Sequence, residues 1–84
     1  MNKCFFIGKI ISDIDFRFVL NNRKIQSAVK FKIKLDNNSI LNVIGYNETA
    51  DYCYQEYSKN LVICLEGRLE SNLNIEIIKI EKFR

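Results

Sequence analysis

The fold is decided by the segment Ser27-Ala-Val-Lys-Phe-Lys-Ile-Lys-Leu35, in which apolar residues alternate with lysines. Successive side chains of a β-strand point to opposite faces of the sheet. The apolar set therefore predicts a side that faces a core, and the lysine set predicts a row of positive charge on the other side. The lysines of this row are Lys30, Lys32 and Lys34.

A second strand-like run, Ser39-Ile-Leu-Asn-Val-Ile-Gly-Tyr46, follows after the turn-forming residues Asp36-Asn37-Asn38. The two runs predict a β-hairpin. We expect the lysine side of this hairpin to form the floor of a groove. Ile40, Asn42, Ile44 and Tyr46 of the second run share one parity, so if Ile40 faces the groove, the other three face it too.

The charge of the chain is unevenly distributed, although the net charge of the 84 residues is only +3. Residues 1–47 carry eight basic and three acidic side chains, whereas residues 48–84 carry five and seven. Six basic residues and no acidic residue lie between Arg17 and Lys34. This polarity is typical of proteins that bind polyanions. A solvated strand face whose lysines protect an edge is the alternative.

The composition argues against several other classes of protein. Three widely spaced cysteines without a histidine predict neither a zinc site nor a disulfide scaffold, but buried thiols in a reducing cytosol. With three glycines and no nucleophile–base motif, we expect no phosphate-cradling loop, no cofactor and no enzymatic activity. No signal peptide or membrane span is visible, and we expect a cytoplasmic protein.

The N-terminal third predicts one long, bent strand. Residues 2–11 are nearly continuous in apolar content, so we expect this strand to be covered on both faces for part of its length. Ser12-Asp13 predicts a bend or bulge, after which residues 15–19 continue the strand. Asn21-Asn22-Arg23 predicts a hairpin loop, because asparagine tolerates the left-handed backbone region.

The remaining segments predict one helix and two further strands. Asn47 is expected to cap a helix over residues 48–57, with Ala50, Cys53, Tyr54 and Tyr57 on one stripe. Strands are expected over residues 61–69 and 73–80, joined at Ser71-Asn72, with a bulge at Ile77-Ile78. The order strand, strand, strand, helix, strand, strand predicts a single all-β domain with one helix, a five-stranded OB-fold barrel over residues 1–84.

Several motifs resemble bacterial single-stranded DNA-binding proteins, the SSB family. The similarity runs in order from residue 1 to about residue 70. It is carried by Met1-Asn2-Lys3, Ile7-Gly8-Lys9-Ile10, Asp13, Arg17-Phe18, Ser27-Ala28-Val29, Val43-Ile44-Gly45-Tyr46, Ala50-Asp51, Tyr57 and Ile63-Cys64-Leu65-Glu66-Gly67-Arg68-Leu69.

The resemblance implies that Tyr46 stands where the family has a base-stacking aromatic residue. It also implies that Ile40 stands where the family often has tryptophan, a residue this chain lacks. The hairpin that family members lay over DNA is reduced to Ser71-Asn72, and the acidic tail that recruits partners is missing. The resemblance is therefore to short members, such as the PriB kind of primosomal protein or SSB-like proteins of mobile elements.

The sequence predicts non-sequence-specific binding of single-stranded DNA, in replication, recombination or mobile-element transfer. The alternative is an OB-fold adaptor that binds a polymerase, primase or helicase, with Ile40 and Ile44 as its contact patch. A homo-oligomer, either a dimer or a tetramer, is expected. The segment Cys4-Phe-Phe-Ile7 lies either at its interface or in the core of the barrel. The candidate nucleic-acid-binding residues are Lys3, Lys9, Arg17, Phe18, Lys30, Lys32, Lys34, Ile40, Asn42, Tyr46 and Arg68.

Overall fold

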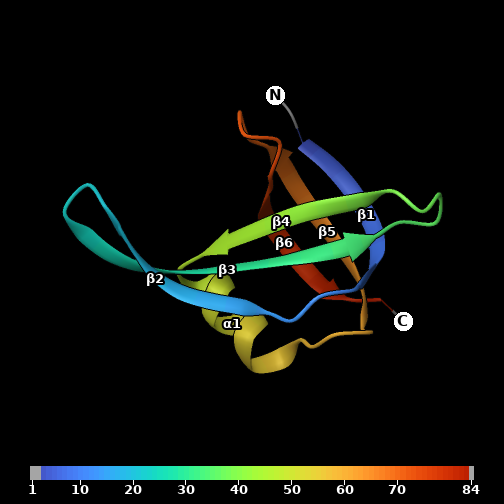
Figure 1. Ribbon diagram of the computed structural model, residues 1–84, viewed down its shortest axis with the longest axis horizontal. Coiled ribbons are helices and arrows are strands. Elements are labelled where there is room, and N and C mark those ends of the chain that lie inside the picture. Colours follow the sequence, from blue (N-terminus) through green and yellow to red (C-terminus); the bar gives the residue numbers. More distant parts are fainter. Residues whose placement is uncertain (1–2, 84) are drawn as a thin grey trace.

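The computed structural model describes residues 3–83 and contains six strands and one helix (Figure 1). In chain order these are β1 (Lys3–Ile10), β2 (Asp15–Asn21), β3 (Lys24–Lys34), β4 (Ile40–Tyr46), α1 (Glu48–Glu56), β5 (Val62–Leu69) and β6 (Ile75–Lys82).

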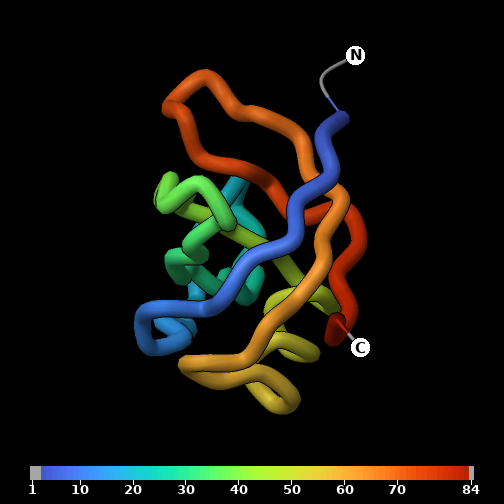
Figure 2. The backbone as a smooth tube through the Cα atoms, turned by 90° about the vertical axis from the view of Figure 1, so that its right-hand side faces the viewer, coloured from blue at the N-terminus to red at the C-terminus, as the bar shows by residue number. Residues whose placement is uncertain are grey.

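The strands form one sheet that closes on itself. Its order is β1-β5-β6-β4-β3-β2, and an additional pairing of β1 with β3 closes the barrel. Figure 2 shows β1, in blue, running beside β5, in orange. β4 and β6 pair in parallel, and the other neighbours pair antiparallel. The predicted five-stranded OB-type barrel is confirmed, since β1, β3, β4, β5 and β6 close it and β2 extends it.

β1 and β2 are the two halves of the predicted bent strand. The bend lies at Ser12, whose Oγ accepts a hydrogen bond from the backbone N–H of Lys32 at 2.8 Å. The N–H of Ile11 donates to the carbonyl of Lys32 at 2.9 Å. These two hydrogen bonds hold the bend against β3. Beyond the bend β2 stays paired with β3, whereas β1 turns towards β5.

The core is centred on β3, whose alternation is as predicted. Val29, Phe31 and Ile33 are 0–3% exposed, while the lysines between and after them are exposed. Burying three apolar side chains on one face stabilises this register by several kcal/mol relative to exposing them, roughly 1.5–3 kcal/mol for each side chain.

The β2–β3 hairpin projects beyond the barrel, at the left of Figure 1. Its two turn residues, Asn22 and Arg23, have φ values of 52° and 65°. Positive φ at both central residues matches the right-handed twist of the flanking strands, so the predicted turn is confirmed. We call residues 18–27 the arm.

α1 begins at the expected place and Asn47 is its N-cap residue, as predicted, but the cap involves no side-chain hydrogen bond within residues 3–83. The backbone of Asn47 has φ 56° and ψ −123°. Capping requires an extended backbone; here the Asn47 Nδ2 instead donates to Gln26 Oε1 of β3 at 3.3 Å. Within residues 3–83, no helix has both the length and the apolar character needed to cross a membrane.

The helical stripe is only partly buried. Ala50, Cys53 and Tyr57 pack in the core, whereas Tyr54 is 58% exposed. Tyr54 lies at the edge of the stripe, where its ring contacts Phe16 of β2 with centroids 4.7 Å apart.

The predicted bulge in the last strand is confirmed. Glu66 pairs with Lys79, but the next residue, Gly67, pairs with Ile77. Ile78 is therefore the extra residue of β6. The bulge moves Ile80 back onto the inner side of the barrel, where it packs against the core.

Two expectations about the N-terminal strand and the thiols are wrong. β1 is not covered on both faces: Phe5 is 78% exposed and Ile7 is 49% exposed, because no other described element lies over their side of the sheet. Only Cys53 is fully buried; Cys4 and Cys64 are half-buried at the barrel surface. Burial raises the pKa of the Cys53 thiol to about 12.

Gly67 allows β5 and β6 to approach closely at the bulge, so we expect Gly67→Ala to destabilise the protein. An added Cβ would overlap Ile75 Cγ2 and lie 3.0 Å from the carbonyl oxygen of Glu76. The expected loss is about 1–3 kcal/mol in the free energy of unfolding, measured by urea denaturation. Ser71→Ala, in the exposed turn, is the control, and an unchanged Gly67→Ala midpoint would contradict the argument.

Candidate nucleic-acid interface

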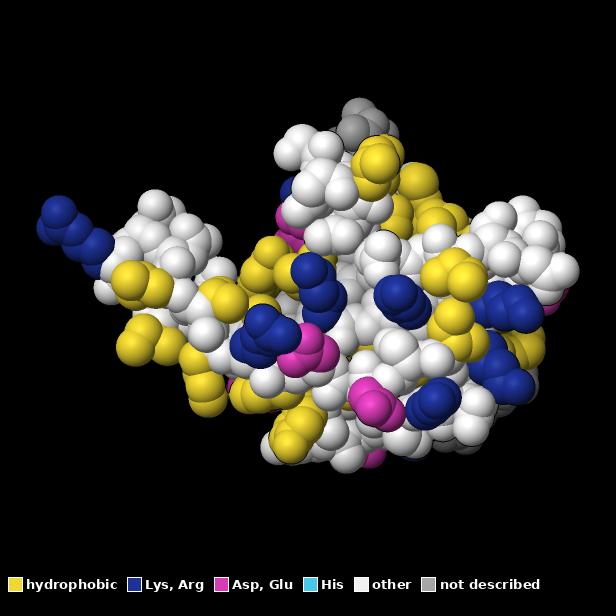
Figure 3. Space-filling view, viewed as in Figure 1, with side chains coloured by type: hydrophobic (Ala, Val, Ile, Leu, Met, Phe, Trp, Pro, Cys, Tyr) yellow, Lys and Arg dark blue, Asp and Glu magenta, His cyan; other side chains and the backbone are white. Residues whose placement is uncertain are grey.

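The register of β3 and β4 brings the predicted groove residues onto one face. Lys30 pairs with Ile44, Lys32 with Asn42, and Lys34 with Ile40. Residues directly opposite each other in an antiparallel pair project to the same side. We call this outer surface of β3 and β4 the lysine face; it faces the viewer in Figure 3, where basic side chains are spread across it. Its members are Lys30, Lys32, Lys34, Ile40, Asn42, Ile44 and Tyr46.

Lys9 extends this row onto β1. It pairs with Lys34 across the contact that closes the barrel. Both side chains are exposed, and lysines two residues apart on β3 are about 7 Å apart along the strand. Four ammonium groups therefore follow a continuous path from Lys30 to Lys9.

Lys3 and Arg68 lie apart from this path. They pair with each other at the far end of the β1–β5 ladder, six residues or about 20 Å from Lys9. The Lys3 Nζ also lies 3.5 Å from Glu66 Oε2. These two basic residues form a separate pair on the β1–β5 surface.

Tyr46 lies at the end of the lysine face that is near the carboxylates of Glu70 and Glu76. It pairs with Ala28 of β3 and is half-buried. Burial raises the pKa of the Tyr46 phenol, and the nearby carboxylates of Glu70 and Glu76 raise it further. The phenol is therefore neutral at physiological pH.

Arg17 of β2 lies on the same face of the sheet as the lysines. It pairs with Ala28 across one edge of β3, whereas Tyr46 pairs with Ala28 across the other edge. Its guanidinium is held by Asp15: Nε donates to Oδ1 at 3.1 Å, and the Arg17–Asp15 ion pair is 3.0 Å long. This contact raises the pKa of the exposed Arg17. A polyanion that contacts Arg17 must compete with this carboxylate.

A shallow hollow of about 280 Å³ lies over Ala28, between β2 and Ile44. It forms because a small residue stands among larger neighbours on the outer side of three paired strands. The hollow was not predicted from the sequence, although Ala28 lies an even number of residues from each lysine of β3 and therefore shares their side of the strand. Its other lining residues are Asp15, Arg17, Val19, Val29 and Lys30.

Phe18 does not border the lysine face. It pairs with Ser27, and the side chain of Ser27 donates a hydrogen bond to Asp51 of α1 on the side of the sheet that the helix covers. Phe18 therefore projects from the opposite face of the sheet, where it is 71% exposed and contacts Phe16 with ring centroids 5.4 Å apart. Side-chain parity differs between positions 17 and 18, so only Arg17 shares the side of the lysines.

The lysine face combines cationic donors, an amide and apolar side chains. Ammonium groups bind anionic oxygens, and a phenol ring and isoleucines provide surfaces for flat bases. In the described part of the chain, no group of three or more His, Cys, Asp or Glu residues could hold a metal ion.

The fold is shared with solved structures of single-stranded DNA-binding proteins. An SSB domain from Synechococcus sp. has a TM-score of 0.84 over 96% of this chain and 94% of its own, at 16% identity. The mitochondrial protein of S. cerevisiae gives 0.84 over 99% and 94%, at 17% identity. The Thermus aquaticus protein gives 0.86 over 100% of this chain and 41% of its own, at 19% identity.

No family model and no curated protein match the sequence. At these identities the likeness establishes the fold: the chain has the OB fold of SSB domains. The structural resemblance implied by the sequence motifs is therefore confirmed at the level of the fold.

The raised pKa of Tyr46 predicts that its phenol titrates above the ordinary value of 10.0. Subtracting the near-ultraviolet titration of Tyr46→Phe from that of the wild type should isolate a midpoint above 10. Because the folded-state pKa is raised, the stability linked to this group is present below the unfolded pKa and is lost as pH rises through the folded pKa. A difference curve centred at or below 10 would contradict the position of Tyr46 beside Glu70 and Glu76.

Proposed function

We propose that the protein binds single-stranded DNA on the lysine face, without sequence specificity. The observation that carries this proposal is the register of β3 against its neighbours. It gathers Lys30, Lys32, Lys34 and Lys9 in one exposed path next to the isoleucines and tyrosine of β4.

The mechanism has a phosphate component and a base component. Lysines that contact phosphates release counterions, which makes the affinity fall as salt rises. Bases would lie on Tyr46 and over Ile40, which is 55% exposed, and each base stacked on an aromatic ring contributes about 1–3 kcal/mol. Because the face has one aromatic ring and a row of four lysines, phosphate contacts supply most of the affinity.

The structural neighbours support this proposal. Proteins with this fold include ones described as single-stranded DNA-binding proteins from bacteria and from mitochondria. We further propose that Arg17 and the hollow over Ala28 continue the path beyond Lys30. Lys3 and Arg68 are too far from this path to contact the same few nucleotides.

Replacing the three lysines of β3 should remove binding. In a fluorescence titration with labelled oligo-dT, the wild type should bind with a slope of log affinity against log salt of about −2 or steeper, because each neutralised phosphate of a single strand contributes about −0.7. The Lys30→Glu, Lys32→Glu, Lys34→Glu variant should show no binding at low salt and keep the wild-type circular dichroism.

A matched variant controls for net charge. Lys59→Glu, Lys79→Glu, Lys82→Glu changes the net charge equally, but its positions lie in the loop after α1 and on β6. Its slope of log affinity against log salt should differ from that of the wild type by less than about 0.7, the contribution of one phosphate contact. Equal loss in both variants, or wild-type binding that is insensitive to salt, would refute the lysine face as the binding site.

One observation favours an adaptor role as the second candidate function. Ile40 is 55% exposed at one end of the lysine face, and Ile44 lies on the same side of β4, four residues further along the strand. A replication protein such as a polymerase, primase or helicase could bury these side chains instead of DNA bases. Co-purification of such a partner, with no shift of oligo-dT at low salt, would favour the adaptor.

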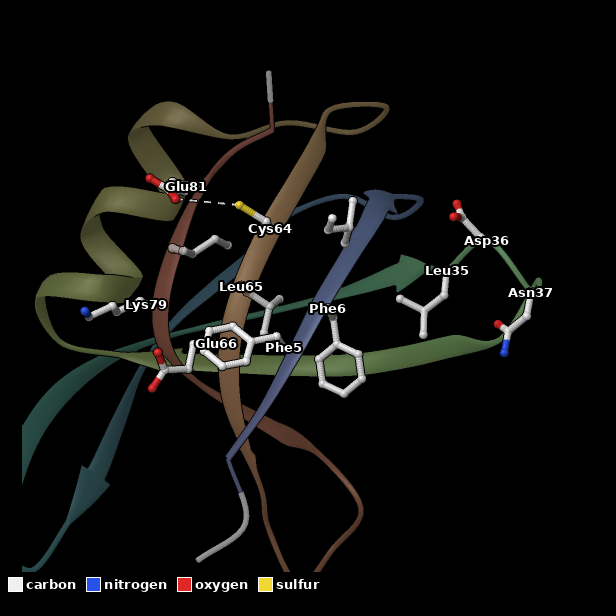
Figure 4. A pocket seen from close by; sticks show the side chains of 12 residues that line it. Phe5, Phe6, Leu35, Asp36, Asn37, Cys64, Leu65, Glu66, Lys79 and Glu81 are labelled. Atoms are coloured by element: carbon white, nitrogen blue, oxygen red, sulfur yellow. Dashed lines mark hydrogen bonds between the residues drawn. The ribbon is translucent and has the colours of Figure 1, made fainter.

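We also propose that the protein self-associates through β1. Phe5 and Ile7 project from the outer face of β1, beside an open concavity of about 970 Å³. In Figure 4, Phe6 lies between Phe5 and Leu35 among the side chains that line this concavity, and a dashed line marks the hydrogen bond from Cys64 Sγ to Glu81 Oε1.

The edge of β1 is suited to such a contact. β3 pairs only with Lys9 and Ile10 of β1, so around Phe6 no second strand lies beside β1 among residues 3–83. An apolar strand with an exposed edge is a template for pairing with another chain. A second copy aligned antiparallel would extend the sheet and cover both exposed apolar side chains.

Phe5→Lys should weaken this association. The new lysine faces Glu66 across β1–β5, so the protomer tolerates it, but two copies repel each other. The mass from light scattering should fall by half relative to the wild type. Leu73→Lys, at a 76% exposed position in the β5–β6 turn, adds the same charge and should leave the mass unchanged. Equal masses for both variants would place the interface elsewhere.

A further inference from the structure

The arm carries a second exposed apolar surface, on the side opposite to the lysine face. Phe18 pairs with Ser27 and Leu20 pairs with Ile25, so all four side chains project to one side. Phe18, Leu20 and Ile25 are 71%, 73% and 75% exposed. Exposed aliphatic and aromatic side chains gathered on one face mark an interaction surface.

This apolar surface continues onto α1 at the base of the arm. Phe16 contacts both Phe18 and Tyr54, with ring centroids 5.4 and 4.7 Å apart. Beside this cluster, Ser27 Oγ donates to Asp51 Oδ1 at 2.9 Å, which places an exposed carboxylate of α1 next to the Phe18–Ser27 row. We call the surface formed by Phe16, Phe18, Leu20, Ile25 and Tyr54 the arm face.

The two ends of the arm face have opposite charge. Arg23 and Lys24 stand at the tip, whereas α1 contributes Glu48, Asp51 and Glu56 at the base and contains no lysine or arginine. In Figure 3, a basic side chain marks the tip at the far left. Along the arm, the Phe18–Ser27 pair lies two residues, about 7 Å, from the Leu20–Ile25 pair in the direction of the base. Arg23 lies the same distance from the Leu20–Ile25 pair in the direction of the tip.

This spacing makes the arm face self-complementary. When two copies pack their Leu20–Ile25 rows together about a two-fold axis, the basic tip of each reaches Phe18 and Asp51 of the other. Each ion pair is then made twice, as a two-fold interface requires. Arg23 would also lie over the ring of Phe18, which is a favourable contact for a guanidinium.

We propose that two copies of this chain associate through their arm faces. The arm face carries the aromatic rings of Phe16, Phe18 and Tyr54, but DNA would bring its phosphates against the carboxylates of α1. A second copy would instead bring a basic tip to these carboxylates, so this surface fits a second copy better than DNA. Arg17 and the lysine face point to the opposite side of the sheet and stay open in such a pair. The proposal does not depend on DNA binding, and it uses a surface separate from β1.

The first test removes the apolar contact. Leu20→Thr with Ile25→Thr keeps strand-forming residues and should halve the mass of the wild type, measured by sedimentation velocity over a wide range of concentrations. Leu69→Thr with Leu73→Ser removes two exposed aliphatic side chains elsewhere and should leave the mass unchanged. The arm variant should bind oligo-dT as the wild type does.

The second test examines symmetry and charge. Leu20→Cys should form a disulfide between the two introduced thiols of an oxidised pair, identified by peptide mapping, whereas Leu73→Cys should not. Arg23→Glu should weaken the association, and adding Asp51→Arg should restore it by reversing both charges.

Three results would overturn the proposal. The first is a wild-type mass that the Leu20→Thr, Ile25→Thr variant leaves unchanged. The second is Leu20→Cys cross-linking no better than Leu73→Cys. The third is weaker oligo-dT binding by the arm variant at unchanged mass, which would make DNA the occupant of the arm face.

Discussion

The structure depends on the burial of one side of β3. This strand is paired on both sides, with β2 and β1 along one edge and β4 along the other, and its inner residues Val29 and Ile33 are fully buried. A shift of one residue in its register would place three lysines in the core and three apolar side chains in water. Because burying an unpaired ammonium group costs several kcal/mol, this alternative is excluded.

That single constraint also organises the surface. Once β3 is locked, every residue paired with a lysine must share its side, which brings Ile44, Asn42 and Ile40 to the lysine face. The same pairing sends Phe18 and Leu20 of β2 to the other side of the sheet. One strand thereby separates a cationic surface from an apolar one, although the residues of both alternate along the chain.

The three surfaces differ in chemistry in a way that suits different occupants. The lysine face is cationic with a few flat apolar side chains, which fits a polyanion carrying bases. The outer side of β1 and the arm face are rich in exposed apolar groups, and acidic residues border each of them. Carboxylates near both apolar surfaces repel phosphates, which agrees with the proposal that second copies of the chain bind there.

Much of this organisation could be predicted from local patterns. The alternation around Phe31, the turn at Asn22, the helix after Asn47 and the bulge at Ile78 depend on residues close in sequence, and all are present. The motif order also indicated the OB-type barrel, because strand order and helix position constrain how so short a chain can close.

The tertiary structure alone decided which separated residues meet. Lys9 joins the lysine row, while Lys3 and Arg68 form a distant pair, because closure of the barrel sets β1 against β3 at one end only. Phe5 lies exposed because no element within residues 3–83 covers its side of the sheet, and the side chain of Asn47 turns towards β3 instead of capping the helix. The sequence by itself determined the two sides of each strand through side-chain parity; what lies opposite each side depends on long-range pairing, which local periodicity does not encode.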